Sequence, residues 1–325
     1  MPPSLAYLIS AHTDAPQLRR LIEALQPEAE YFVHIDLKSS IAPFLRELDQ
    51  FPNVHFIPER VNVQWGTMLE VEYQMNLLRA AVHHPRRFDH IFFLSGMDYP
   101  LWSRSRINQF LLEHAGQEFL QGICLDTPDI GERQRLMYTI SRPYFRSRKV
   151  SILARKLLKL TGYRKKRHFQ VDGREWKLYK GSAWWCISQE LAAYLLEQFE
   201  TRPQISRYFR DSFCPAETLI QTIAFNAPQW ARRCILSTGP YQSLAALTPL
   251  HFIEYDPVIR ILDETDFDRL LASGKMFCRK VVSGRSDRLL DKLIERNMEV
   301  QRDRPTPSPS AGGELRSAQP IPYSK

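Results

Sequence analysis

The first hundred residues alternate short apolar runs with longer segments in which apolar residues recur every three or four positions. Short apolar runs predict buried strands, and the longer periodic segments predict amphipathic helices. The expected order is strand 5–10, helix 15–25, strand 31–36, helix 39–51 (opened by serine), strand 53–57, helix 67–84 and strand 90–95. Strands and helices that alternate at this spacing predict an α/β fold, with a mostly parallel central sheet and helices on both faces.

Polar residues and a glycine follow three of these strands. Ligands of parallel sheets bind at the carboxyl ends of the strands, so these positions are candidate ligand contacts. They are Ser10 and His12 at the end of the first strand, Asp36 at the end of the second, and Gly96, Met97 and Asp98 after the strand at 90–95. Either aspartate alone could cap the next helix, whereas two at neighbouring strand ends favour a polar ligand. They do not form a D-x-D pair, although two acids could still bind Mg²⁺.

The rest of the chain predicts one domain over residues 1–300, followed by a disordered tail. Residues 181–199 combine a short strand with a helix, whereas the stretch from about 120 to 180 is irregular. A basic insertion lies at about 142–170. Residues 301–325 are rich in Pro, Ser and Gly and poor in core-forming residues, which predicts the tail.

Much of the net charge of +8 comes from the basic segment, residues 146–167, which holds ten Lys or Arg and no acid. Its apolar spacing predicts an amphipathic helix with a basic face. Such a helix is either a solvated surface element or a contact for an anionic membrane or acidic polymer. Nucleic acid is the weaker partner, because aromatic residues are sparse and no nucleic-acid-binding motif accompanies the charge.

Several functional classes find no support in the sequence. The five cysteines are scattered and contain no C-x-x-C pair, which argues against a zinc site and for a reducing compartment. The chain shows no signal peptide and no long apolar span, so we expect a soluble cytoplasmic protein. Phosphate-loop, dinucleotide-binding and G-x-S-x-G hydrolase motifs are absent from the sequence.

One acid stands out in the mostly apolar stretch "SFCPAETLIQTIAFN", residues 212–226. If Pro215 opens a helix, Cys214 is its N-cap and Glu217 falls at the third helical position, where a carboxylate caps backbone amides. The same position would also hold a carboxylate at the mouth of a cleft, ready to take a proton. The local sequence leaves both interpretations open.

Ordered blocks along residues 5–281 resemble the core-2/I-branching glycosyltransferase family, which includes branching β-1,6-N-acetylglucosaminyltransferases and peptide O-xylosyltransferases. The blocks are "YLISAH", "YFVHIDLKS", "VQWGTMLEVEYQMNLL", "FDHIFFLSGMDYPL", "YKGSAWWCIS", "FCPAETLIQTI" and "KMFCRKV". The resemblance implies a GT-A type fold, a nucleotide-sugar donor and transfer with inversion at the anomeric carbon. The basic segment and the tail lie outside it.

Residue by residue, the resemblance makes Glu217 the catalytic base, matching the glutamate of an S-P-D-E type motif. This chain departs from that motif at Cys214 and Ala216, which puts contacts to the acceptor in doubt. The remaining implied contacts are Ser10, His12, Asp36, Gly96, Met97 and Asp98 to the donor, Trp184 to the acceptor, and Arg260 and Lys280 to the donor diphosphate. Arg260 sits a few residues closer to Lys280 than in the animal enzymes.

The expected activity is therefore transfer of a sugar, N-acetylglucosamine, from a UDP-sugar to a hydroxyl of a glycan or lipid-linked glycan. No metal or other cofactor and no nucleic-acid partner are expected, and the basic segment would touch the inner face of an anionic membrane. Two alternatives stay open. One is a xylosyltransferase that uses UDP-xylose, and the other is a noncatalytic membrane-binding or nucleic-acid-binding protein acting through the basic segment.

Overall fold

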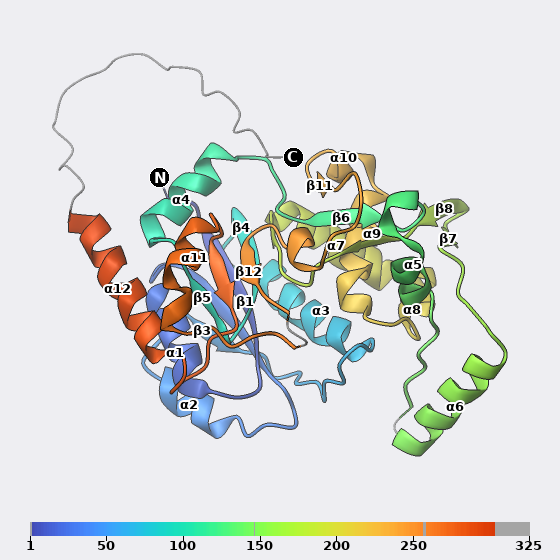
Figure 1. Cartoon of the computed structure of the whole chain (residues 1–325), viewed down its shortest axis with the longest axis horizontal. Helices are drawn as coiled ribbons and strands as arrows, with labels where there is room; N and C mark the ends of the chain where they lie inside the picture. Colours follow the sequence, from blue (N-terminus) through green and yellow to red (C-terminus); the bar gives the residue numbers. More distant parts are fainter. Residues whose placement is uncertain (1, 146, 256–257, 303–325) are drawn as a thin grey trace, which may run out of the picture.

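The computed structural model describes residues 2–145, 147–255 and 258–302 (Figure 1). Most of the expected tail, from residue 303 onward, lies outside the described residues. Over these ranges, no helix has both the length and the apolar character needed to cross a membrane.

A five-stranded sheet in the order β10-β4-β1-β2-β3 forms the centre of the fold. The strands are β1 (Leu5–Ala11), β2 (Glu30–Ile35), β3 (Val54–Phe56), β4 (His90–Ser95) and β10 (Cys186–Ile187). β1 pairs in parallel with β2 and β4, β2 pairs in parallel with β3, and β10 joins β4 in antiparallel. The predicted α/β fold with a mostly parallel sheet is confirmed.

Alternate residues of β1 belong to different hydrophobic clusters, because successive strand side chains point to opposite faces of a sheet. Tyr7 and Ile9 pack with residues of α1 (Ala15–Ala24) and α2 (Ala42–Leu48). Ala6 and Leu8 pack with residues of α3 (Leu69–Val82), α7 (Gln189–Thr201) and α9 (Leu219–Phe225). Helices therefore cover both faces of the sheet, as the alternating sequence predicts.

The helix expected at 39–51 is shorter in the structure, and serine does not cap it. α2 begins at Ala42, and Ile41 at its N-cap makes no side-chain capping bond. Pro43, in the first turn, suits a helix start because it has no N–H to donate. The Ser39 hydroxyl instead donates to the His12 carbonyl oxygen at 2.6 Å, which ties this loop to the end of β1.

The stretch that reads as irregular in the sequence contains strands of only three or four residues. Three smaller sheets have the orders β11-β6-β9, β12-β13-β5 and β7-β8. Their strands are β5 (Asp98–Pro100), β6 (Gln121–Cys124), β7 (His168–Val171), β8 (Arg174–Lys177), β9 (Tyr179–Gly181), β11 (Ile235–Leu236), β12 (His251–Ile253) and β13 (Phe277–Arg279). The further helices are α4 (Arg104–Glu113), α5 (Glu132–Tyr138), α6 (Arg148–Leu160), α8 (Pro203–Phe209), α10 (Pro228–Ala231), α11 (Phe267–Ala272) and α12 (Asp287–Arg302).

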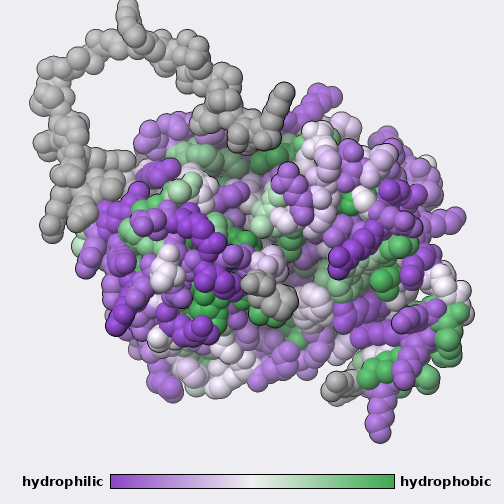
Figure 2. Space-filling model, in the orientation of Figure 1, coloured by the Kyte–Doolittle hydropathy of each residue, from purple (hydrophilic) through white to green (hydrophobic). Residues whose placement is uncertain are grey.

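The basic segment forms the predicted amphipathic helix, α6, which stands away from the body of the molecule (Figure 1). The Ser147 hydroxyl caps it by accepting from the Val150 N–H. Apolar side chains on α6 are exposed among basic ones (Figure 2). Lys165, beyond the helix, is an exception among the segment's charges: it is buried and lies 2.6 Å from an Asp211 carboxylate oxygen. That cation belongs to the packed body of the protein.

Candidate active site

Among the described residues, two side chains bind the carboxylate of Glu217, and no backbone N–H donates to it as in a helix cap. Pro215–Glu217 forms a single 3₁₀ turn, with Cys214 before it in the left-handed region at φ 46° and without a side-chain capping bond. A Glu217 carboxylate oxygen accepts from the Tyr138 hydroxyl and from the Lys180 ammonium, the latter at 3.1 Å. The Glu217 side chain is 19% exposed, so the held carboxylate still reaches solvent.

Lys180 is the buried counter-charge of this carboxylate. It lies in β9 with a side chain only 1% exposed, and its ammonium stands 4.6 Å from the centroid of the Tyr138 ring. A buried ammonium is costly unless it is paired. Glu217 provides that pairing, and the Tyr138 ring face adds a cation–π contact. The Lys180–Tyr138 pair therefore fixes the position of the Glu217 carboxylate.

A second carboxylate, Glu70, lies near Glu217 in the first turn of α3. Burial raises the pKa of Glu70 to about 7, and the negative charge of Glu217 adds to the rise. The Gly66 N–H donates to Glu70 at 2.7 Å, which opposes the rise by stabilising the ionised form. The same glycine accepts from the Cys214 N–H at 3.2 Å through its carbonyl. The loop before α3 thus ties Glu70 to the turn that carries Glu217.

The carboxyl ends of the central strands bring several of the predicted donor contacts together. Ser10 lies opposite Ser95 of β4 in the sheet register. The Gly96 N–H donates to the Ser10 carbonyl at 2.9 Å. A Cβ at Gly96 would come within 2.9 Å of the Ala11 Cβ, so glycine is required for this close approach. Met97 is 7% exposed and accepts from the Val281 N–H, which joins this edge to the chain after β13.

Positive charge gathers next to these strand ends. Partial burial lowers the pKa of His12, and the charges of Lys280, Arg279 and Lys38 lower it further, although Asp36 opposes them. Asp36 accepts from the Lys38 N–H at 2.9 Å, and the Lys38 ammonium lies 3.4 Å from its other oxygen. Burial and the charge of Arg279 lower the pKa of Lys280. Among the described residues no carboxylate pairs with Lys280, so its charge remains available to an anion.

Asp98 is fully buried, and its carboxylate binds other groups of the protein. Its oxygens accept from the Arg279 guanidinium at 2.8 Å and from the Ser95 N–H at 2.7 Å, and the His251 ring lies 3.4 Å away. Although burial opposes ionisation, Arg279 and His251 hold the pKa of Asp98 below its usual range. The Arg279 guanidinium in turn lies 4.8 Å from the Trp184 ring centroid. Asp98 therefore orients Arg279 against Trp184 from a position with no exposed surface of its own.

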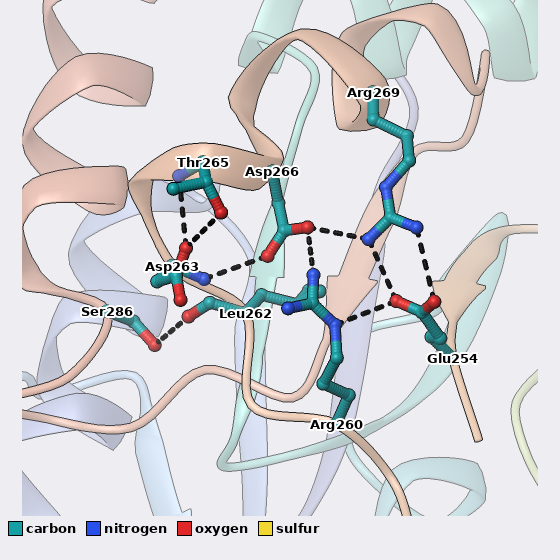
Figure 3. Close-up of polar contacts among 8 residues, drawn as sticks. All are labelled: Glu254, Arg260, Leu262, Asp263, Thr265, Asp266, Arg269 and Ser286. Atoms are coloured by element: carbon teal, nitrogen blue, oxygen red, sulfur yellow. Dashed lines mark hydrogen bonds and ion pairs between the residues drawn. The ribbon is translucent and has the colours of Figure 1, made fainter. Parts of the chain in front are cut away.

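Arg260 is engaged in a network of ion pairs (Figure 3). Its guanidinium lies 2.8 Å from Glu254 and also pairs with Asp266. Arg269 binds the same two carboxylates, at 2.8 Å and 2.6 Å. The two arginines and two acids balance in charge. Among the described residues, Arg260 and Lys280 are linked through backbone atoms alone: the Lys280 N–H donates to the Arg260 carbonyl at 3.4 Å.

One group of side chains within the described ranges has the spacing of a metal site, and it lies away from the predicted site residues. Its members are Glu30, at the start of β2, with His55 and His84. The His84 Nδ1 atom accepts from the Arg86 N–H, and Arg86 lies 3.5 Å from Glu30. These contacts compete with ligation. Asp36 and Asp98 belong to no such group in the part of the chain that the structure describes.

Sequence reasoning missed four residues of this arrangement: Glu70, Tyr138, Lys180 and Arg279. Three of them carry a detectable signal, because each is a charged residue inside one of the family-like blocks, "VQWGTMLEVEYQMNLL", "YKGSAWWCIS" or "KMFCRKV". Tyr138 belongs to no block, and only the folded chain brings its hydroxyl to Glu217.

The fold and site define an α/β protein with ionisable side chains gathered at the carboxyl ends of parallel strands. Residues 5–256 match the Core-2/I-Branching enzyme family. The chain belongs to this family, which confirms the resemblance seen in the sequence.

Curated relatives include a xylosyltransferase of Caenorhabditis briggsae, 21% identical over 65% of this chain and 25% of that protein. A β-glucuronosyltransferase of Arabidopsis thaliana is 25% identical over 90% of this chain and 64% of its own length. A human β-1,3-galactosyl-O-glycosyl-glycoprotein β-1,6-N-acetylglucosaminyltransferase is 25% identical over 67% of this chain and 48% of its own length. The chain thus spans about a quarter of the length of the xylosyltransferases it matches. Among solved structures, mouse xyloside xylosyltransferase 1 aligns at 10% identity over 84% of this chain and 97% of that chain, with a TM-score of 0.33, too distant to support an argument.

Proposed function

We propose that this chain is an inverting glycosyltransferase that moves N-acetylglucosamine from its UDP-sugar to a hydroxyl of a glycan or lipid-linked glycan. The observation that carries the proposal is the set of contacts and the exposure of the Glu217 carboxylate. Its carboxylate is held by Lys180 and Tyr138, remains partly exposed and makes no capping bond at its turn. A fixed carboxylate in a family of sugar-transferring enzymes suits the role of general base.

In a single displacement, the acceptor oxygen attacks the anomeric carbon as its proton passes to Glu217, and the bond to the diphosphate breaks on the opposite side. The diphosphate gains negative charge as it leaves. Fixed cations can stabilise that charge without a metal. Lys280 has no carboxylate partner among the described residues. Its charge lowers the pKa of His12, and the charge of Arg279 lowers the pKa of Lys280, so these cations lie near one another. We therefore propose metal-independent transfer with Lys280 at the diphosphate.

The position of Arg260 favours a lesser role in that step. Its charge is balanced by Glu254 and Asp266, so a donor diphosphate would have to compete with both carboxylates. Asp36, near Lys38 and His12, is the proposed contact of the nucleoside. Trp184, stacked on Arg279, is the proposed wall of the acceptor site.

The donor sugar is tested by incubating the full chain with UDP-N-acetylglucosamine, UDP-xylose and UDP-glucuronic acid, the last because an Arabidopsis relative is a glucuronosyltransferase. UDP release and thermal stabilisation are measured for each. Selective response to UDP-N-acetylglucosamine supports the proposal, and selective response to UDP-xylose supports the alternative donor. If no UDP-sugar is bound or hydrolysed, the enzyme proposal fails and a noncatalytic binding protein becomes the better account.

A contact with anionic membrane is the second part of the proposal, at the inner face of a cytoplasmic membrane. Along α6, apolar residues at helical spacing are exposed: Val150 at 48%, Leu153 at 59%, Leu157 at 55% and Leu160 at 83%. The exposed Lys149, Lys156 and Lys159 lie on the same helix. An apolar stripe flanked by lysines suits the boundary between lipid headgroups and acyl chains. The five free cysteines agree with a reducing compartment.

Flotation with vesicles tests this contact. Leu153→Ser with Leu157→Ser should reduce binding to phosphatidylserine-containing vesicles, and Lys149→Gln with Lys156→Gln should reduce it further, by about 1 kcal/mol per charge. Lys165 is left unchanged because it is buried against Asp211. The double Leu112→Ser, Leu136→Ser variant is the control, since both leucines are exposed outside α6. Equal flotation of the α6 variants and the parent would refute the contact.

A further inference from the structure

A cavity of about 330 Å³ lies between α6 and the loop that precedes α3. Pockets for small ligands typically begin at about 300 Å³. Two stretches that are far apart in the sequence, residues 64–67 and 142–155, line it. We call it the α6 pocket and define it by Trp65, Arg142, Phe145, Ser151, Ile152 and Arg155.

Two arginines give this pocket its charge. Within the described ranges, no carboxylate forms an ion pair with Arg142 or Arg155, and both side chains are half-buried. Burial lowers the pKa of Arg155, and the like charge of Arg142 lowers it further. Two guanidinium groups that repel each other favour a bound anion between them. A guanidinium presents forked N–H donors that match the geometry of carboxylate and phosphate.

Aromatic rings form the other part of the lining. Trp65 is 67% exposed and Phe145 is 46% exposed, which is unusual for side chains of this size in a folded protein. The Arg142 guanidinium lies 5.6 Å from the Trp65 ring centroid and 5.2 Å from that of Phe213, so the rim of the pocket is ordered. The Ser151 hydroxyl bonds the Phe145 backbone at 2.9 Å and 3.0 Å. A flat apolar ring held beside a guanidinium suits a pyranose that carries an acidic group.

The α6 pocket is adjacent to the residues around Glu217 in the candidate active site. Phe213 contacts Trp65 at a ring-centroid distance of 5.7 Å and Tyr138 at 6.2 Å. The Tyr138 hydroxyl donates to Glu217. The positive charge of Arg142 also acts on Glu70, where it opposes the rise in pKa. One aromatic ring therefore separates the pocket from the residues around the proposed base.

We propose that the α6 pocket is an acceptor subsite that binds an acidic sugar unit, with its carboxylate or phosphate group between Arg142 and Arg155 and its ring on Trp65. This inference rests on the proposed transferase function, since it assigns the pocket to the glycan whose hydroxyl reaches Glu217. Apart from Trp65, the pocket's defining residues lie outside the family-like blocks. The subsite would select among acceptors that differ in charge.

Calorimetric titration of the full chain with three matched disaccharides tests the inference. Cellobiose is neutral, cellobiouronic acid carries a carboxylate at the same carbon, and cellobiose 6′-phosphate carries a phosphate there. At least one acidic probe should bind more tightly than cellobiose, by about tenfold or more, as expected for a charge-assisted contact. Preference between the acidic probes identifies the acidic group.

Variants separate charge recognition from general damage. Arg155→Gln should lose most of the preference for the acidic probe and leave cellobiose binding unchanged, whereas Trp65→Ala should weaken all three probes. Lys177→Gln, which removes an exposed cation of β8 outside the pocket lining, should bind like the parent. Arg155→Gln also removes the hydrogen bond from Arg155 to the Pro143 carbonyl. Arg155→Lys, which keeps the positive charge, is the control for that loss and should keep part of the preference for the acidic probe.

Equal affinity for cellobiose and both acidic probes, or an unchanged preference in Arg155→Gln, would overturn the inference. Thermal stabilisation by UDP, measured in parallel, distinguishes the two proposals. A chain that binds UDP but shows no preference for acid retains the proposed function and loses the subsite. A chain that binds the acidic probe at Arg155 but neither binds UDP nor hydrolyses UDP-sugars loses the proposed function instead.

Discussion

Replacing Glu70 with glutamine measures how much the second carboxylate beside Glu217 lowers the free energy of unfolding. The pKa of Glu70 is raised from 4.5 to about 7, mainly by burial and further by the charge of Glu217. Between these values the folded chain keeps a proton that the unfolded chain has lost. Stability therefore falls as the pH rises through this window, and the full cost is present above it. At 1.36 kcal/mol per pKa unit, the cost is about 3 kcal/mol.

Glutamine can still accept the Gly66 N–H bond, which is 2.7 Å in the parent, but it cannot ionise. Urea unfolding should show Glu70→Gln to be more stable than the parent by about 3 kcal/mol at pH 8 and by less than about 1 kcal/mol at pH 5. The exposed Glu59, whose side chain makes no ion pair among the described residues, supplies the control Glu59→Gln. Its stability should follow that of the parent at both pH values.

The contribution of Glu217 to this cost can be separated with a double-mutant cycle. Removing the Glu217 charge should lower the pKa of Glu70, so the gain from Glu70→Gln at pH 8 should be smaller in a Glu217→Gln background. A gain that is the same at pH 5 and pH 8, or a loss of stability at pH 8, would refute the reasoning about Glu70.

Three further predictions follow from the charged groups. Asp98→Asn removes the buried partner of Arg279 and should destabilise the fold by about 3–5 kcal/mol, measured by urea unfolding; a loss below 1 kcal/mol would contradict this. Lys280→Ala should slow transfer by roughly 10²–10³, with partial recovery in Lys280→Arg, whereas Arg260→Gln should have a smaller effect because Glu254 and Asp266 already balance Arg260. Transfer should persist in excess EDTA; loss restored by manganese would make Asp36 a metal-ligand candidate.

The first half of the fold is predictable from sequence because its strands are continuous apolar runs and its helices have clear periodicity. The strand expected at 90–95 is β4, with the same bounds, and the helix in the basic segment is α6. The smaller sheets are not predictable in this way. Strands such as β9 and β13 are three residues long, too short for a period, and are defined by partners far along the chain.

The same limit applies to the site. The sequence directs attention to Glu217 because it is a single acid in mostly apolar surroundings, and to Lys280 because its block "KMFCRKV" resembles the family. They do not reveal that Lys180 and Tyr138 bind Glu217, since those contacts depend on β9 and α5 meeting the 3₁₀ turn in space. They also give no sign that Asp98 is fully buried or that Arg260 is paired with acids.

Transfer by Glu217→Gln, measured as initial rate with saturating donor and acceptor, tests the central claim most directly. The amide preserves the shape of the side chain but cannot take the acceptor proton, so the rate should fall by roughly 10²–10⁴. UDP-sugar binding by titration should stay close to that of the parent, whereas the unfolding midpoint in urea should fall, because the buried Lys180 ammonium loses its charged partner. A folded variant that binds donor and turns over at near the parent rate would show that Glu217 is not the base.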